Sequence, residues 1–159
     1  MKNIALLLLT IATLSGCAVS GHLYPVQGPL AAQTPLPIFD ITLGHVLAEP
    51  ISATLQNGEI CKGPWGQVLP SDPSANKMSS EWDLVYGQGF FVANVLGSSS
   101  LYRGDLTGTA GTTLHVEFFL HNPQDMTSAK GMAQDNRGNV YKLMASSSSP
   151  LGAGATPAK

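Results

Sequence analysis

Two histidines and a glutamate in one stretch of the chain have the residue types of a metal site. They are His115, Glu117 and His121. On an extended strand the first two lie about 7 Å apart on one face, which two long side chains can bridge around an ion. His121 would lie about 20 Å from His115 along the same strand, too far for a shared ion. Either His22 or His45 would have to complete the site, so we expect a polar strand face and no resident metal.

Cys61 is the second candidate for chemistry, because a thiolate is a nucleophile when a base lies beside it. His45 or His115 could serve as that base, but nucleophilic catalysis also needs an orienting group in contact. No local motif in the chain brings such a set together. We therefore expect Cys61 to be a buried thiol that packs as a small apolar group. The prediction is a protein with no catalytic residue and no cofactor, and a metal- or cysteine-dependent hydrolase is the least favoured alternative.

The N-terminal residues have the three parts of a secretory signal peptide. Lys2 gives a positive start, residues 4–14 are apolar apart from two threonines, and small residues follow at positions 15 and 16. Such a charged, apolar and small-residue order is typical of an export signal. The apolar run is too short to span a bilayer, which takes about 20 residues. The sequence predicts a signal peptide over residues 1–16.

The segment Leu14-Ser15-Gly16-Cys17 matches the lipobox of bacterial lipoproteins, so the chain resembles that class. The resemblance implies a diacylglyceryl group on the Cys17 thiol, cleavage between Gly16 and Cys17, and acylation of the new amine. Several acyl chains hold a protein firmly in a membrane. Ala18 stands where an aspartate would signal retention in the inner membrane. The implied location is the cell envelope, anchored by lipid to the outer membrane, on the periplasmic side rather than at the cell surface.

Composition excludes some partners and bounds the domain count. The chain has 159 residues with 8 Lys and Arg against 10 Asp and Glu, a net charge of −2, which becomes −3 when Lys2 leaves with the signal peptide. Nucleic-acid binding calls for a basic face, so no nucleic-acid partner is expected. The length fits one domain with its own core. Seventeen glycines and eleven prolines indicate many turns rather than long helices.

A hairpin gives the clearest local signal of structure. Asn57-Gly58 lies between two runs that alternate apolar and polar residues. This pair predicts a two-residue type I′ turn, with Leu55 opposite Ile60. A second hairpin is expected near the C-terminal end of the domain, with Gly138 in the left-handed conformation of its loop.

Regular turn signals between short apolar runs predict a mainly β protein. Its fold would be a small antiparallel β-barrel or sandwich of about seven strands with one short helix. The helix is expected over 73–85, and strands over 38–46, 51–56, 59–62, 90–96, 102–109, 113–120 and either side of 135–138. In the strand over 113–120, alternate residues from Leu114 to Leu120 would face the core, with His115, Glu117 and Phe119 on the other face.

Composition along the chain divides it into four parts. After the signal peptide, 17–37 holds the lipidated cysteine and a Pro-rich segment expected to be an extended tether. The alternative is that 23–26 packs on the domain. An all-β domain is expected over 38–145. The Ser-, Pro- and Ala-rich tail over 146–159 lacks the apolar content to fold.

Two pairs of neighbouring phenylalanines indicate a second apolar surface. In a strand, Phe90 and Phe91 must point to opposite faces, and so must Phe118 and Phe119. One member of each pair therefore lies outside the main core. We expect this second surface to be covered by a helix or to be an interaction surface for another envelope protein.

These observations together predict a membrane-anchored envelope lipoprotein that acts as a non-catalytic accessory or protein-interaction component. The alternative is a carrier of a small apolar ligand in a barrel cavity. The pattern from the Asn57-Gly58 hairpin to the run from Gly138 to Lys142 is similar to small proteobacterial lipoproteins. No activity is established for that group, so this second resemblance implies no function.

Overall fold

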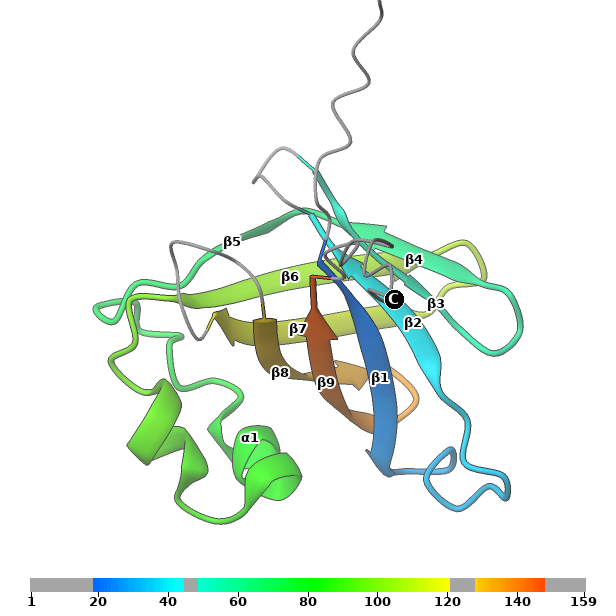
Figure 1. Cartoon of the computed structure of the whole chain (residues 1–159), viewed down its shortest axis with the longest axis horizontal. Coiled ribbons are helices and arrows are strands. Elements are labelled where there is room, and N and C mark those ends of the chain that lie inside the picture. Colours follow the sequence, from blue (N-terminus) through cyan, green and yellow to red (C-terminus); the bar gives the residue numbers. More distant parts are fainter. Residues whose placement is uncertain (1–18, 45–48, 121–127, 148–159) are drawn as a thin grey trace, which may run out of the picture.

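The computed structural model describes residues 19–44, 49–120 and 128–147, and its main feature is a closed antiparallel β-barrel (Figure 1). The strands and helices follow in chain order: β1 (Val19–Gln27), β2 (Phe39–Leu43), β3 (Ile51–Thr54), β4 (Ile60–Gly63), β5 (Trp65–Gln67), α1 (Ser79–Tyr86), the π-helix η1 (Phe91–Val95), β6 (Leu101–Gly108), β7 (Thr113–Leu120), β8 (Ser128–Asp135) and β9 (Val140–Ser146). The predicted mainly β fold with a short helix is confirmed.

The barrel is an up-and-down meander. The sheet order is β4-β3-β2-β1-β9-β8-β7-β6-β5, and a further pairing between β4 and β6 closes the ring. β1 pairs antiparallel with both β2 and β9, so the first and last strands lie side by side. Closure leaves the eight strands of the ring without free edges, which protects an all-β protein from pairing with other chains.

β4 and β5 are two halves of one bent strand. Cys61 of β4 lies opposite Gly108, and Trp65 of β5 lies opposite Gly104, so both halves keep the same register against β6. Pro64 separates them, and proline has no N–H to donate to a ladder. The bend lets β4 close the ring while β5 extends along the first half of β6.

The barrel interior is filled by one continuous apolar cluster. Strand alternation points every second residue inward, and these side chains are nearly all buried. The cluster includes Leu23, Phe39, Ile41, Leu43, Ile51, Ala53, Cys61, Leu106, Leu114, Val116, Phe118, Ala133, Tyr141 and Leu143. An eight-stranded barrel has an interior just wide enough for side chains to fill it, and this one follows that rule.

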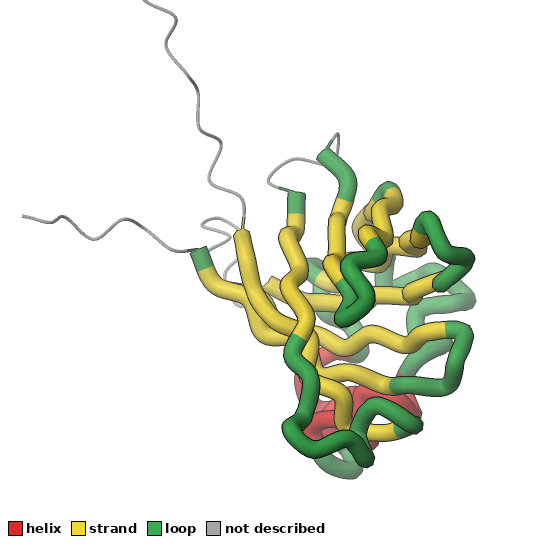
Figure 2. Tube along the Cα trace, turned by 90° about the vertical axis from the view of Figure 1, so that its right-hand side faces the viewer, coloured by secondary structure: helices red, strands yellow, loops and turns green. Residues whose placement is uncertain are grey.

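A helical segment covers part of the outside of the barrel, next to β7, β8 and β9 (Figures 1 and 2). Trp82 of α1 and Phe91 of η1 pack with Met132 and Val140, whose side chains point outward from the strands. The Tyr86 hydroxyl lies 2.9 Å from the Gly131 carbonyl oxygen and 3.0 Å from that of Leu143. These contacts hold α1 against the strands and form a second core outside the barrel.

The predicted strand over 90–96 is wrong, because this segment forms η1. Gly87 and Gly89 have positive φ values and turn the chain just before it. The Asp83 carboxylate then accepts bonds from the backbone N–H groups of Gly89 and Phe91, at 3.0 and 2.9 Å. A short apolar run bounded by turns cannot be assigned to strand or helix by its periodicity alone.

The predicted helix exists but begins later than expected. α1 starts at Ser79, whereas Asp72 and Pro73 lie in a turn. The Asp72 carboxylate accepts bonds from the N–H and the hydroxyl of Ser74, at 2.8 and 2.9 Å. Aspartate side chains make such local turns as readily as they cap helices.

The hairpin at Asn57-Gly58 forms, but its register differs from the predicted one by one residue. Leu55 pairs with Glu59, and Thr54 lies opposite Ile60. The Gly58 N–H donates to the Leu55 carbonyl, which closes a turn with a three-residue loop. Gly58 has a φ of 77°, so it occupies the left-handed position that such loops require. The second hairpin has the same form, with Gly138 at φ 81° as predicted.

The first part of the Pro-rich segment expected to be a tether belongs to the barrel. β1 covers 19–27 and pairs along its length with β2 and β9. Pro25 fits because the register against β9 shifts between Pro25 and Gln27, at a bulge. The alternative in which 23–26 packs on the domain therefore holds, and the domain begins before residue 38. The expected tail over 146–159 begins one residue too early, because Ser146 ends β9. The expected signal peptide and residues 148–159 of the tail lie outside the described residues.

Candidate functional site

The two ends of the barrel differ in the loops and side chains that surround them. We call the end where β1 begins and β9 ends the proximal end; it lies at the top of Figure 1. We call the other end the barrel mouth. Four connections lie at the mouth: the loops over 28–38 and 109–112, and the hairpin loops over 55–59 and 135–139.

A cavity of about 390 Å³ opens at the barrel mouth. Its apolar wall is formed by Leu30, Phe39, Leu55 and Tyr141, and the rings of Phe39 and Tyr141 meet edge to face at 5.9 Å. Its polar wall is formed by Gln56, Asn57, Asp135, Arg137 and Asn139. This volume falls in the lower part of the range of small-molecule pockets, about 300–1,000 Å³.

Asp135 organises one side of the mouth. Its Oδ1 accepts bonds from the backbone N–H groups of Arg137 and Asn139, both at 2.9 Å. Its Oδ2 accepts from the Asn139 amide at 2.8 Å and from the Tyr141 hydroxyl at 2.7 Å. Burial, and then the bond to Asp135, raises the pKa of Tyr141, so its hydroxyl stays protonated as the donor. Both oxygens of the Asp135 carboxylate therefore already accept hydrogen bonds from the protein itself.

Glu59 organises the other side. Its Oε2 accepts from the Thr112 hydroxyl at 2.7 Å, and its Oε1 accepts from the backbone N–H groups of Ala110 and Thr112 at 2.8 and 3.2 Å. The bond from the Thr112 hydroxyl, helped by the backbone bonds, holds the pKa of Glu59 below its usual value of 4.5. Glu59 is therefore an anion at neutral pH and fixes the loop between β6 and β7.

Arg137 is the cation at the mouth. Its Nη2 lies 3.8 Å from the Glu59 Oε2, which is longer than a hydrogen bond, and its side chain is 55% exposed. Within the part of the chain that the structure describes, this guanidinium has no hydrogen bond and no other ion pair. A guanidinium carries five N–H donors in a planar fork, so Arg137 has donors available to a ligand.

Cys61 lies inside the barrel, and its chemistry follows from that position. The residue is fully buried, and the Cβ that a side chain at Gly108 would need lies 2.8 Å from its Sγ. Burial, and then the nearby Glu59 carboxylate, raises the pKa of the Cys61 thiol. A buried, protonated thiol is a poor nucleophile. The structure thus places Cys61 as a packing residue under the mouth.

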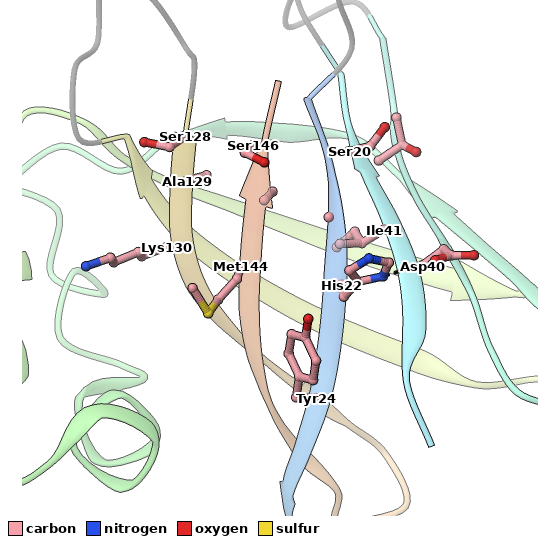
Figure 3. A pocket seen from close by; sticks show the side chains of 13 residues that line it. Ser20, His22, Tyr24, Asp40, Ile41, Ser128, Ala129, Lys130, Met144 and Ser146 are labelled. Carbon is pink, nitrogen blue, oxygen red and sulfur yellow. Dashed lines mark ion pairs between the residues drawn. The ribbon is translucent and has the colours of Figure 1, made fainter. Parts of the chain in front are cut away.

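A second hollow lies on the outer face of the barrel, over β8, β9, β1 and β2 (Figure 3). This outer groove has a volume of about 870 Å³. It is lined by Ser20, Gly21, His22, Tyr24, Asp40, Ile41, Thr42, Ser128, Ala129, Lys130, Met144, Ala145 and Ser146. The His22 Nδ1 pairs with the Asp40 Oδ1 at 3.1 Å, and the exposed Met144 is the apolar side chain in its middle. Most of the other side chains that line it are small or hydroxylated.

The structure separates the residues considered for a metal site. His115 is exposed and pairs with Asp105, with 2.5 Å between Nδ1 and Oδ1. Glu117 is fully buried under the helical segment, where Trp82 Nε1 donates to it at 2.8 Å and Arg103 Nε at 2.7 Å. No group of three metal-ligating side chains occurs among the described residues. His45 and His121 lie outside them.

The four phenylalanines of the expected second surface are accounted for by packing. Phe118 is fully buried in the barrel, and Phe91 is 2% exposed in η1. Phe90 and Phe119 are half-buried against the same outer cluster as Trp82. The helix-covered alternative therefore describes this surface, because the helical segment occupies the face that Phe119 presents.

The lipidation and cleavage positions, Cys17 and Gly16, lie outside the described residues. In sequence, Cys17 precedes the start of β1 by two positions. The described residues include no helix long and apolar enough to cross a membrane.

Sequence analysis did not single out the residues at the barrel mouth. Glu59 and Asp135 each stand next to a hairpin loop, where acidic residues are common for local reasons. Thr112, the partner of Glu59, lies 53 positions away in the loop before β7, and only the folded barrel brings the two together. Tyr141, the partner of Asp135, lies on β9 on the other side of the second hairpin. The comparison of this chain with protein-family models, with curated proteins and with solved structures finds no match.

Proposed function

We propose that this protein is a membrane-anchored envelope lipoprotein that acts as a non-catalytic binding component. Its anchor is the acylated Cys17, and its working part is the β-barrel. The barrel's outer groove is the surface offered to an envelope protein partner.

The observation that carries this proposal is the position of the outer groove relative to the start of β1. β1 enters the barrel at Val19, two positions after Cys17, with Leu43 as its partner at the proximal end. Ser20 and Ser146, which line the groove, are also paired at this end. An acyl anchor at Cys17 would therefore hold the groove close to the membrane surface, where a membrane-bound partner can reach it.

Two features support a binding role rather than catalysis. The buried carboxylates of Glu59, Glu117 and Asp135 all accept hydrogen bonds from the fold. A general base or nucleophile instead needs a free reactive atom that a substrate can reach. The raised pKa of the buried Cys61 thiol also keeps it in its less reactive form.

Labelling with a radioactive fatty acid in a Gram-negative host tests the anchor. We expect the full chain to incorporate the label and to sediment with membranes, and Cys17→Ser to lose both properties. Cys61→Ala is the matched cysteine control and should keep the label, because Cys61 is buried in the barrel. Labelled acyl groups that persist in Cys17→Ser would refute the lipoprotein assignment.

A carrier of a small apolar ligand is the second candidate, and the cavity at the barrel mouth favours it. The filled interior rules out a ligand in the middle of the barrel, since that space is occupied by the apolar cluster. The mouth, by contrast, combines an apolar wall with Arg137 at its rim. A carrier would therefore hold its ligand at the mouth.

A further inference from the structure

We propose that the barrel mouth binds a small organic acid, with the apolar body against Phe39 and Tyr141 and the carboxylate on Arg137. The inference rests on the second proposed function, the carrier. It does not depend on the lipid anchor, because the mouth is at the opposite end of the barrel from the start of β1.

The apolar part of the ligand follows from the cavity wall. Phe39 and Tyr141 are almost fully buried and line the cavity. Leu30 and Leu55 are partly buried side chains that pack on the barrel core from above. An apolar body in the cavity would contact the two rings and shield the partly exposed Leu30 and Leu55 from water. Removal of apolar surface from water is the usual source of affinity in such pockets.

The acidic part of the ligand follows from the donors and acceptors left at the rim. The carboxylate oxygens of Asp135 and Glu59 already accept hydrogen bonds from groups of the protein itself. An ammonium group would therefore find no free carboxylate oxygen there. Arg137, by contrast, keeps its N–H donors free, since among the described residues its guanidinium has one ion pair, at 3.8 Å from Glu59, and no hydrogen bond. A guanidinium binds a carboxylate through two parallel hydrogen bonds, which are stronger than bonds between neutral groups.

The site is preorganised, because hydrogen bonds within the protein hold its loops in place. The Leu30 N–H donates to the Asn139 Oδ1 at 2.9 Å, which ties the loop over 28–38 to the second hairpin. Gly28 allows this approach, because a Cβ there would lie 2.6 Å from the Gly138 carbonyl oxygen. Asp135 in turn fixes the backbone of Arg137. A prearranged site loses less conformational freedom on binding, so even a small ligand can be held.

Calorimetric titration of the full lipidated chain in phospholipid nanodiscs tests the inference, with empty nanodiscs as the blank for partition into lipid. The probes are octanoate, 1-octanol and octylammonium. The variant Arg137→Met removes the charge and keeps an apolar stem. Lys62→Met is the matched control, because Lys62 is an exposed cation on the outside of β4 that does not line the cavity.

We expect saturable one-to-one binding of octanoate, weakened roughly tenfold or more in Arg137→Met and unchanged in Lys62→Met, as for loss of a charge-assisted bond. The methyl NMR signals of Leu30 and Leu55 should shift with octanoate, and those of the exposed Leu84 should not. Because the Arg137 side chain is half-exposed, the variant should keep the wild-type melting temperature.

Three results would overturn the inference. Tighter binding of octylammonium than of octanoate, or equal octanoate affinity in wild type and Arg137→Met, would show that Arg137 does not select an acid, while a carrier function would remain. Absence of saturable binding of all three probes would overturn both the inference and the carrier.

Discussion

Three buried carboxylates determine much of the polar structure of this protein. Glu59 and Asp135 hold the loops at the barrel mouth, and Glu117 holds the helical segment through Trp82 and Arg103. Only 11% of the residues are charged, so these three are a large share of the available carboxylates. Glu117 accepts from α1 and β6, Glu59 accepts from the loop between β6 and β7, and Asp135 accepts from the second hairpin and β9. Each carboxylate therefore ties its own segment to another part of the fold.

Glu59 makes the stability of the protein sensitive to acid. Its folded-state pKa lies below 4.5, so its contribution to stability is complete above that pH and is lost as the pH falls through the folded-state value. We expect Glu59→Gln to lower the melting temperature at neutral pH and to flatten the loss of stability as the pH falls below 4.5. Thermal unfolding followed by circular dichroism across this range measures both effects.

Asp40→Asn is the control for Glu59→Gln, because the Asp40 side chain is 81% exposed and its loss removes no buried bond. The account of Glu59 fails if the two variants have the same dependence of melting temperature on pH.

At the residue scale, the sequence predicts which face of a strand a residue occupies, but not which distant residue it binds. The inward face of the strand over 113–120 was predictable, because alternation decides it within one segment. The partnership of Glu117 with Trp82 was not, since it joins residues 35 positions apart on a strand and a helix. His115 and Glu117 share a face as expected, but the helical segment buries one and leaves the other exposed.

At the scale of elements, the sequence predicts the turns better than the strands and helices between them. Both hairpins form at their glycines, because Gly58 and Gly138 take positive φ values that other residues rarely adopt. The π-helix over 91–95 was missed because its apolar residues fit a buried strand equally well. β1 was missed because Pro25 is unusual in a strand, and a bulge accommodates it here.

The helical segment depends on one buried indole. Trp82 is fully buried and stacks near Tyr86 and Phe90, and its N–H serves Glu117. We expect Trp82→Phe to lower the free energy of unfolding by about 1–3 kcal/mol, because Glu117 then loses a donor inside the protein. Urea unfolding followed by circular dichroism measures the change.

Leu84→Ala on the same helix is the matched control. The Leu84 side chain is 50% exposed, and its loss should change the free energy of unfolding by no more than about 0.5 kcal/mol. If Trp82→Phe were as mild as Leu84→Ala, the bond from Trp82 to Glu117 would not hold the segment in place.

At the scale of the whole molecule, the barrel has two unlike sides and two unlike ends. The helical segment packs over β8 and β9 on one side, while the outer groove opens over β1, β2 and the proximal ends of β8 and β9 (Figures 1 and 3). The proximal end lies next in sequence to Cys17, and the barrel mouth faces the other way. An anchor at Cys17 would therefore place the groove near other membrane proteins and point the mouth toward the aqueous phase.

Site-directed photo-crosslinking in native envelopes tests this arrangement most directly. A photoreactive phenylalanine analogue replaces Met144 in the outer groove or Val92 on the outside of η1; these side chains are 45% and 67% exposed. The account predicts one discrete protein adduct from position 144, none from position 92, and loss of the adduct when Cys17→Ser is added. Equal adducts from both positions, or an adduct from position 92 alone, would contradict it.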